Sequence, residues 1–181
     1  MPKSPVRPER SAAAGGAKSK DPLAVVRRVM AGDRWAAAAG ARLVEVREGY
    51  ARTTLRLRDD HLNGVEVAQG GAIFTLADYA FAAASNSHGT VAVALDTSMT
   101  FVRAATKGVL TAEAREESLT RRTSVCNVRV TDAGGKVVAL FRGTAFRKDD
   151  PLDAVLAARG KARRRGPREG AVAAPRRTGT R

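Results

Sequence analysis

The segment Ala72–Ala84 constrains the fold of this chain more than any other part of the sequence. Eleven of its thirteen residues are apolar, and the two exceptions are Thr75 and Asp78. A helix over this segment is apolar on every side, and such a helix is typical of a buried position. The rest of the domain is therefore expected to wrap around one long central helix.

The segments around this helix have the pattern of strands. In residues 50–58, Ala51, Thr53, Leu55 and Leu57 alternate with polar or aromatic residues, as expected for a strand with one buried face. Turns are expected at 48–49 and 132–135, because both contain glycine between strand-like runs. The expected strands are 43–46, 50–58, 91–103, 109–116, 120–131 and 136–147. We therefore predict an α+β fold, with an antiparallel sheet wrapped around one long central helix.

Two short helices are expected before the first strand. Asp21 is a good N-cap, and Pro22 at the first helical position predicts a helix that ends near Met30. Asp33 caps a second short helix, which Gly40 ends. Neither helix is long enough to supply a core alone, so both are expected to pack on the central one.

The net charge of +14 is concentrated at the two ends of the chain. Residues 1–20 carry +4 and residues 158–181 carry +8, which leaves only +2 for residues 21–157. Both ends are rich in Pro, Gly, Ala and Arg and have no apolar periodicity, so we expect them to be disordered. The predicted organisation is one domain over 21–157 between two basic tails. A phosphate-binding arm is the alternative interpretation of the arginine-rich end.

The chain offers few residues for metal or disulfide chemistry. It has one cysteine, Cys126, and two histidines, His61 and His88. A single cysteine excludes an intramolecular disulfide and indicates a reducing compartment. Residues 1–20 lack the apolar stretch of a secretory signal, and no window has the length of a membrane span. We predict a soluble cytoplasmic protein without a metal or cofactor.

Asp78 is the residue least expected at its position. A carboxylate amid apolar residues is costly to bury unless it has a partner. It must therefore be paired structurally, or it must face a cleft and take part in chemistry. Burial raises the pKa of a carboxyl group, which suits it to the role of a base or a nucleophile.

The residues that open the same helix suit a polarised carbonyl. Gly70 and Gly71 allow a ligand to approach the backbone closely, and the first N–H groups of a helix favour an oxyanion. Gly-Gly before a helix also occurs as an ordinary turn, and Asn63 in the preceding loop is also typical of a turn. Eight residues separate Gly70 from Asp78, or about 12 Å along a helix. One substrate carbonyl cannot touch both, so a site that uses both needs two antiparallel helices, most simply from a twofold dimer.

Residues 59–104 resemble the hot-dog-fold acyl-CoA thioesterases of the PaaI type, which act in phenylacetate degradation. That family has a His/Met-Leu-Asn loop, then His-Gly-Gly six residues after the Asn, then Leu-Ala-Asp nine residues after the His. The corresponding segments here are HLN at 61–63, QGG at 69–71 and LAD at 76–78. The resemblance extends over about residues 33–148. It implies a hot-dog domain that forms dimers or tetramers and hydrolyses a CoA thioester, with an aryl group such as phenylacetyl or a medium-chain acyl group.

The resemblance also implies the site. Asp78 matches the carboxylate that acts as general base or nucleophile, Gly70 matches the N–H donor to the thioester carbonyl, and Asn63 matches the residue that places the carboxylate or the water. The carboxylate comes from one subunit and the glycine from the other. The substrate contacts expected in addition are Gly71, His61 and Ala94, the last on the strand where relatives often have Ser or Thr; Thr97 lies on the same strand. Candidate partners of the CoA phosphates are Arg103, Arg121, Arg122, Arg142 and Arg147.

Gln69 departs from the family pattern, which has histidine there. Glutamine keeps a donor and an acceptor but cannot become positively charged. Three functions are therefore considered: a thioesterase, a hot-dog protein that binds acyl-CoA or acyl carrier protein without turnover, and a nucleic-acid protein acting through its basic tails. Hot-dog dehydratases need a catalytic histidine with an acid, and neither His61 nor His88 lies in such a motif. We predict the thioesterase, with Gln69 among its catalytic residues and without nucleic acid as its partner.

Overall fold

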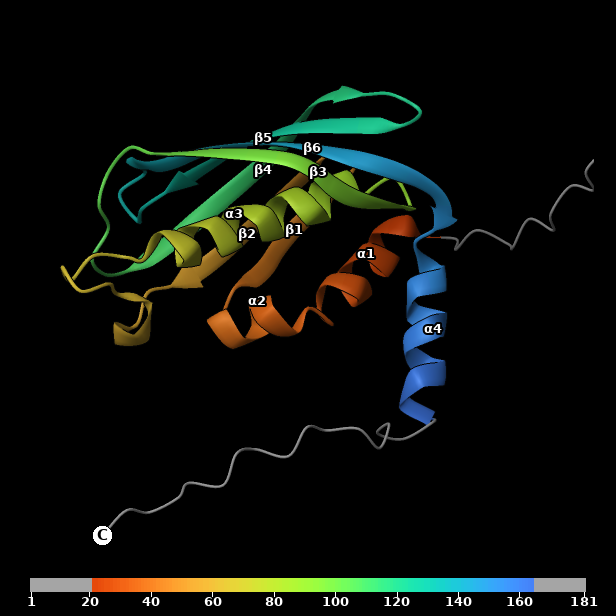
Figure 1. Ribbon diagram of the computed structural model, residues 1–181, viewed down its shortest axis with the longest axis horizontal. Helices are drawn as coiled ribbons and strands as arrows, with labels where there is room; N and C mark the ends of the chain where they lie inside the picture. The colour runs from red at the N-terminus through yellow and green to blue at the C-terminus, as the bar shows by residue number, and fades with distance from the viewer. Residues whose placement is uncertain (1–20, 165–181) are drawn as a thin grey trace, which may run out of the picture.

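One long helix lies against a six-stranded antiparallel sheet in the computed structural model, which describes residues 21–164 (Figure 1). The helix is α3 (Gly70–Ser85), and the order of the strands is β1-β2-β4-β5-β6-β3. The strands are β1 (Arg42–Arg47), β2 (Tyr50–Arg56), β3 (Thr90–Phe101), β4 (Val109–Leu119), β5 (Thr123–Thr131) and β6 (Val137–Pro151). The predicted sheet around one central helix is confirmed, and most strand boundaries differ from the expected ones by a few residues.

The core lies between α3 and the sheet. Leu76, Ala80 and Phe81 of α3 are almost fully buried there. Gly143 of β6 lies directly against the Phe81 ring, so a Cβ at this position would be 2.8 Å from the ring atom Cζ. The absence of a side chain thus lets the strand come close to the helix. This close packing holds α3 in a defined position relative to the sheet.

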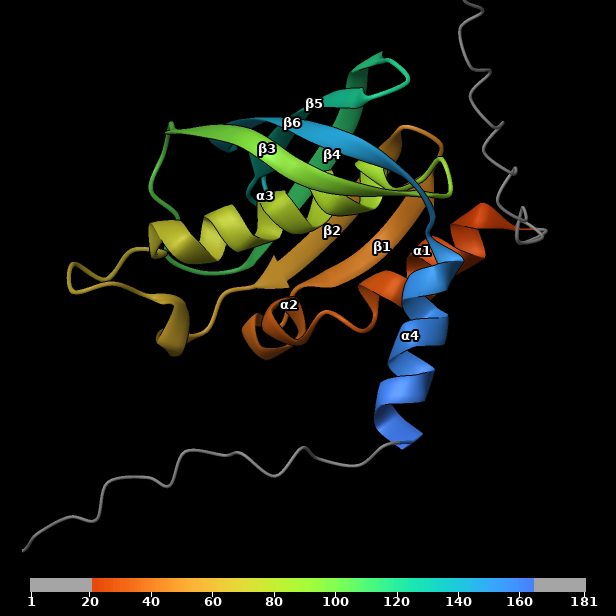
Figure 2. The same cartoon turned by 45° about the vertical axis from the view of Figure 1, so that its right-hand side comes forward.

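Two short helices cover the side of α3 that faces away from the sheet (Figure 2). They are α1 (Pro22–Met30) and α2 (Arg34–Ala39), with Asp21 and Asp33 as the expected N-caps. The Tyr79 hydroxyl of α3 donates a 3.0 Å hydrogen bond to the Met30 carbonyl. The Trp35 indole N–H of α2 donates to Thr75 Oγ1, also over 3.0 Å. The two short helices are therefore tied to α3 by polar contacts as well as by packing.

The C-terminal boundary of the domain lies beyond the predicted residue 157. Helix α4 (Asp153–Arg164) includes residues 158–164, which the sequence assigned to a disordered tail. The Arg159 guanidinium donates 3.1 Å hydrogen bonds to the Val29 and Gly32 carbonyls at the end of α1. Helix formation by Ala, Lys and Arg, together with this tertiary contact, explains the difference. The parts predicted as tails over 1–20 and 165–181 lie outside the described residues.

Strand β3 is an edge of the sheet that carries exposed apolar side chains. Val93, Leu95, Phe101 and Val102, the last just beyond the strand, are among the exposed large apolar residues. Edge strands in soluble proteins are usually covered or charged, because their free backbone groups pair readily with another chain. Within residues 21–164 no strand pairs with the outer side of β3. This edge has the features of an interaction surface.

Candidate active site

Asp78 lies in the middle of α3, on a stripe that faces away from the sheet. The stripe is more exposed than the rest of the helix and consists of Gly71, Phe74, Thr75, Asp78 and Ala82. The Asp78 side chain is half-buried, and within residues 21–164 it has no hydrogen bond or ion pair. Burial raises the pKa of Asp78, and the negative charge of Asp33 raises it further. The direction of this shift agrees with the sequence-based expectation and suits a group that accepts a proton.

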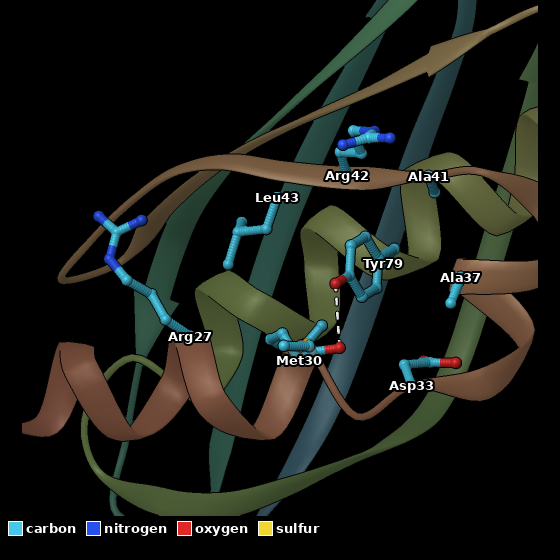
Figure 3. A pocket seen from close by; sticks show the side chains of 9 residues that line it. Arg27, Met30, Asp33, Ala37, Ala41, Arg42, Leu43 and Tyr79 are labelled. Atoms are coloured by element: carbon cyan, nitrogen blue, oxygen red, sulfur yellow. Dashed lines mark hydrogen bonds between the residues drawn. The ribbon is translucent and has the colours of Figure 1, made fainter.

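Asp33 is a neighbour of Asp78 that the sequence did not reveal. Its side chain caps α2 by accepting hydrogen bonds from the Trp35 and Ala36 N–H groups, at 2.9 and 3.0 Å. Figure 3 shows it beside Tyr79, at a pocket of about 430 Å³ between α1, α2 and the start of β1. Sequence patterns identify Asp33 only as a helix cap, and no local signal connects it with a residue 45 positions later.

Gln69 is the N-cap of α3 and leaves one backbone donor free. Its side-chain oxygen accepts hydrogen bonds from the Gly71 and Ala72 N–H groups. Within the described residues, the Gly70 N–H has no acceptor and the Gln69 side-chain NH₂ group has no partner. The start of the helix thus offers a backbone N–H and an amide NH₂ group, both suited to a carbonyl oxygen.

Asn63 shapes the loop that leads into α3. Its side-chain oxygen accepts from the Val65 and Val67 N–H groups, at 3.0 and 3.3 Å, and its own N–H donates to the Val67 carbonyl over 2.8 Å. The oxygen is therefore engaged within the loop. Only the NH₂ group of Asn63 is left for a substrate or a water molecule.

His61 is buried under the same loop and is only 6% exposed. Its Nδ1 accepts a 3.2 Å hydrogen bond from the Arg58 N–H, and its carbonyl accepts one of 2.8 Å from the Gln69 N–H. The Nε2 atom lies 3.8 Å from Asp60. This position fits support of the loop better than the substrate contact that the family resemblance implies.

Ala94 and Thr97 lie on the helix side of strand β3. Ala94 is opposite Ala145 and Thr97 is opposite Gly143, and both partners are buried against the core. Directly opposite residues of an antiparallel pair share a face, so Ala94 and Thr97 face the side that holds α3. A bulge between Ala94 and Asp96 places both residues on this face although three positions separate them.

One chain brings together only half of the expected site. Asn63, His61, Gln69 and Gly70 gather at the start of α3, whereas Asp78 lies about 12 Å further along the helix. No loop of the described chain returns Asp78 to the Gly70 N–H. The two halves remain separate within one subunit.

The arginines expected near CoA phosphates fall into two groups. Arg103 and Arg121 are exposed and have no ion pair among the described residues. Arg103 lies two residues before Ala105, whose carbonyl accepts the Ala68 N–H over 2.7 Å, so it shares the end of the domain with Gly70. The other three make local contacts: Arg122 with Asp149 at 3.0 Å, Arg142 with Asn127 at 3.2 Å and Arg147 with the Thr120 carbonyl at 2.6 Å.

Other reactive side chains of the described residues have structural surroundings. Burial raises the pKa of the Cys126 thiol to about 11, so this thiol is not a nucleophile at neutral pH. His88 lies just beyond the far end of α3, between Glu116 at 2.7 Å and Glu48 at 3.2 Å. Residues 21–164 contain no cluster of His, Cys, Asp and Glu that could hold a metal ion. None of their helices has the length and apolar character needed to cross a membrane.

Comparison with known proteins identifies the family. The profile of the thioesterase superfamily matches residues 66–139. The acyl-coenzyme A thioesterase PaaI of Escherichia coli K12 is 38% identical over 116 residues, which are 64% of this chain and 83% of that protein. The chain belongs to the thioesterase superfamily. It is a hot-dog acyl-CoA thioesterase of the PaaI type, an enzyme that hydrolyses acyl-CoA thioesters, as the sequence predicted.

Solved structures agree with this assignment. The E. coli PaaI structure matches the thioesterase with a TM-score of 0.70 and 32% identity, over 75% of this chain and 99% of that one. The phenylacetic acid degradation protein PaaI of Thermus thermophilus matches with a TM-score of 0.62 and 40% identity, over 64% and 100% of the two chains. A "hypothetical thioesterase protein" of Streptococcus pneumoniae, solved with coenzyme A, has a TM-score of 0.64 and 26% identity, over 67% and 98%.

Proposed function

We propose that Asp78 is the catalytic carboxylate of this thioesterase and that it works with the Gly70 N–H of a second copy of the chain. The observation that carries the proposal is the state of Asp78: half-buried, without a partner in residues 21–164, and with a raised pKa. A structural aspartate would have a hydrogen-bond donor or a cation beside it. A carboxylate left free on an accessible face of the central helix is available for chemistry.

The reaction needs one base and one site for the developing oxyanion. Asp78 removes a proton from water as the water oxygen bonds to the thioester carbon, and the carbonyl oxygen becomes an oxyanion at the Gly70 N–H. When the C–S bond breaks, the carbonyl forms again and CoA leaves as a thiolate. The proton held by Asp78 then returns to the thiolate. A thiol has a pKa of about 8.5, so this leaving group needs little acid assistance.

The edge strand supports a site shared between two subunits. Pairing of β3 with the β3 of a second copy would cover the exposed apolar residues Val93, Leu95 and Phe101 and complete the backbone hydrogen bonds of the edge. A twofold axis at this edge would also place two α3 helices antiparallel on the same side of the joined sheet. Asp78 of one copy would then face the helix start of the other.

Gln69 is proposed to position the thioester as a neutral donor. Its oxygen is occupied by the helix N–H groups, so only its NH₂ group can turn to the substrate. The Asn63 NH₂ group is a second donor at the same end, free to hold the attacking water. Because a neutral amide already supplies the donor, we expect Gln69→His to leave kcat within about threefold of the wild type. A larger increase would show that positive charge, and not only position, matters at this residue.

The proposed substrates are aryl-CoA and medium-chain acyl-CoA thioesters, with phenylacetyl-CoA and hydroxyphenylacetyl-CoA as the first to test. Two relatives of the PaaI type support the aryl group, since one is a phenylacetic acid degradation protein and the other comes from the phenylacetic acid degradation operon. Release of CoA is measured with a thiol reagent. We expect Asp78→Asn to lower kcat by about 10² to 10⁴-fold. The matched control is Asp150→Asn, an exposed aspartate of β6 far along the chain, which should keep wild-type activity.

Mixed subunits test the shared site directly. Asp78→Asn and Gly70→Ala chains are each expected to be nearly inactive alone. In a dimer that contains one of each, one site carries both substitutions and the other carries none. Half of the dimers in an equal mixture are of this kind, so coexpression should restore about a quarter of wild-type activity. No recovery in a verified mixed dimer, or a monomer in light scattering, contradicts the shared site.

A further inference from the structure

A cavity of about 550 Å³ lies next to the exposed stripe of α3. Its walls come from four parts of the chain: the turn between α1 and α2, the second half of α3, the start of β3 and helix α4. The apolar side chains that line it include Met30, Trp35, Ala82, Val91, Leu152 and Val155. A volume of this size is within the usual range for pockets that hold small organic ligands.

The cavity is continuous with the proposed position of catalysis. Ala82 lies one helical turn after Asp78 on the same face, so their Cβ atoms are about 5–6 Å apart. Thr75 lies almost one turn before Asp78 and holds the Trp35 indole N–H at 3.0 Å. A thioester carbon at Asp78 would therefore have the apolar wall formed by Trp35 and Ala82 beside it.

Helix α4 closes the far side of the cavity. Val155 and Leu152 line it, and Arg159 fixes the helix by donating to the Val29 and Gly32 carbonyls. The fit at Gly32 is tight, because a Cβ there would be 1.8 Å from Arg159 Nη1. Arg159 thus clamps α4 to the turn that carries Asp33 and Trp35. The wall is fixed by two charge-assisted hydrogen bonds to the end of α1.

We propose that this cavity takes the distal, apolar part of the acyl group and that Val155 of α4 determines how long an acyl group the enzyme accepts. The proposal rests on the placement of the thioester at Asp78. Each methylene group moved from water into an apolar cavity contributes about 0.8 kcal/mol, or about fourfold in kcat/KM. We therefore expect kcat/KM of the wild type to rise about fourfold per methylene group along a series of straight-chain acyl-CoA substrates, until the chain reaches α4.

The first test uses a larger residue in the wall. Val155→Phe fills part of the cavity, and we expect kcat/KM to fall at least tenfold for octanoyl- and decanoyl-CoA while that for acetyl-CoA stays within twofold. The matched control is Ala157→Phe, which adds the same group on the exposed side of α4. Unchanged acetyl-CoA hydrolysis also shows that Val155→Phe is folded. Equal effects of the two substitutions at every chain length would overturn the proposal.

The second test measures binding without turnover. Trp35 is the only tryptophan of the chain and lines the cavity, so its fluorescence reports on what enters. With full-length Asp78→Asn protein we expect octanoyl-CoA to shift the emission to shorter wavelength and CoA alone to leave it unchanged. The same response to both ligands, or none to either, would contradict an acyl group beside Trp35. If the wild type hydrolyses no thioester but the octanoyl-CoA shift is present, the catalytic proposal fails while the cavity proposal stands.

Discussion

Replacement of Gly70 by alanine separates catalysis from stability at the start of α3. The new Cβ would lie 3.0 Å from Phe101 Cζ, closer than ordinary van der Waals contact. The Phe101 side chain is 54% exposed, so its ring can turn aside. Alanine also favours the helix over glycine by about 0.5–1 kcal/mol. These opposing effects nearly cancel, and we expect the free energy of unfolding to change by less than about 1 kcal/mol.

Activity should respond much more strongly than stability to the same change. The methyl group and the displaced Phe101 ring both stand beside the Gly70 N–H, where the carbonyl oxygen must come within hydrogen-bonding distance. Loss of one oxyanion donor lowers kcat by about 10² to 10³-fold, which is about 2.7–4 kcal/mol in the transition state. The loss should be in kcat more than in KM, because the oxyanion forms only during the reaction.

The assay pairs urea unfolding with thiol release on the best substrate of the panel. Gly64→Ala is the control, because it changes a glycine of the same loop whose added Cβ would have no atom within 4 Å. It should keep both wild-type stability and wild-type activity. The assignment of Gly70 is refuted if Gly70→Ala keeps kcat within about threefold. It is also refuted if activity falls only in proportion to a loss of folded protein.

Three further substitutions test the surroundings of the site. Asp33→Asn keeps a good N-cap but removes the negative charge that raises the pKa of Asp78, so the acid limb of kcat should move to lower pH, because Asp78 must be deprotonated to act; a shift to higher pH would contradict this coupling. Gln69→Ala removes the cap of α3 and should lower the free energy of unfolding by about 1 kcal/mol in urea, and an unchanged midpoint would show that the cap does not contribute. Gly143→Ala would place a Cβ 2.8 Å from the buried Phe81 ring, which cannot move aside, so the thermal transition should reveal a loss of about 1–3 kcal/mol.

Local sequence patterns were sufficient for the elements and for the most informative residue. The caps Asp21 and Asp33, the turn at 132–135 and the central helix depend on contacts between residues only a few positions apart, and these contacts are visible in the sequence. Asp78 stood out for the same reason, since a charge within an apolar helix contradicts its immediate neighbours. The spacing of the segments 61–63, 69–71 and 76–78 indicated the family, which comparison then confirmed.

Tertiary structure decided which distant residues meet. The strand order that leaves β3 at the edge, and the approach of Asp33 to Asp78, depend on how whole elements pack and not on local periodicity. The helical course of residues 158–164 was missed because their composition is that of a solvated tail; what holds them is a guanidinium that reaches the end of α1. The sequence by itself therefore determined the central helix, its unusual carboxylate and the thioesterase family. Only the packing of elements far apart in the chain determined the surroundings of that carboxylate, because electrostatic and apolar contacts act over distances in space and not along the sequence.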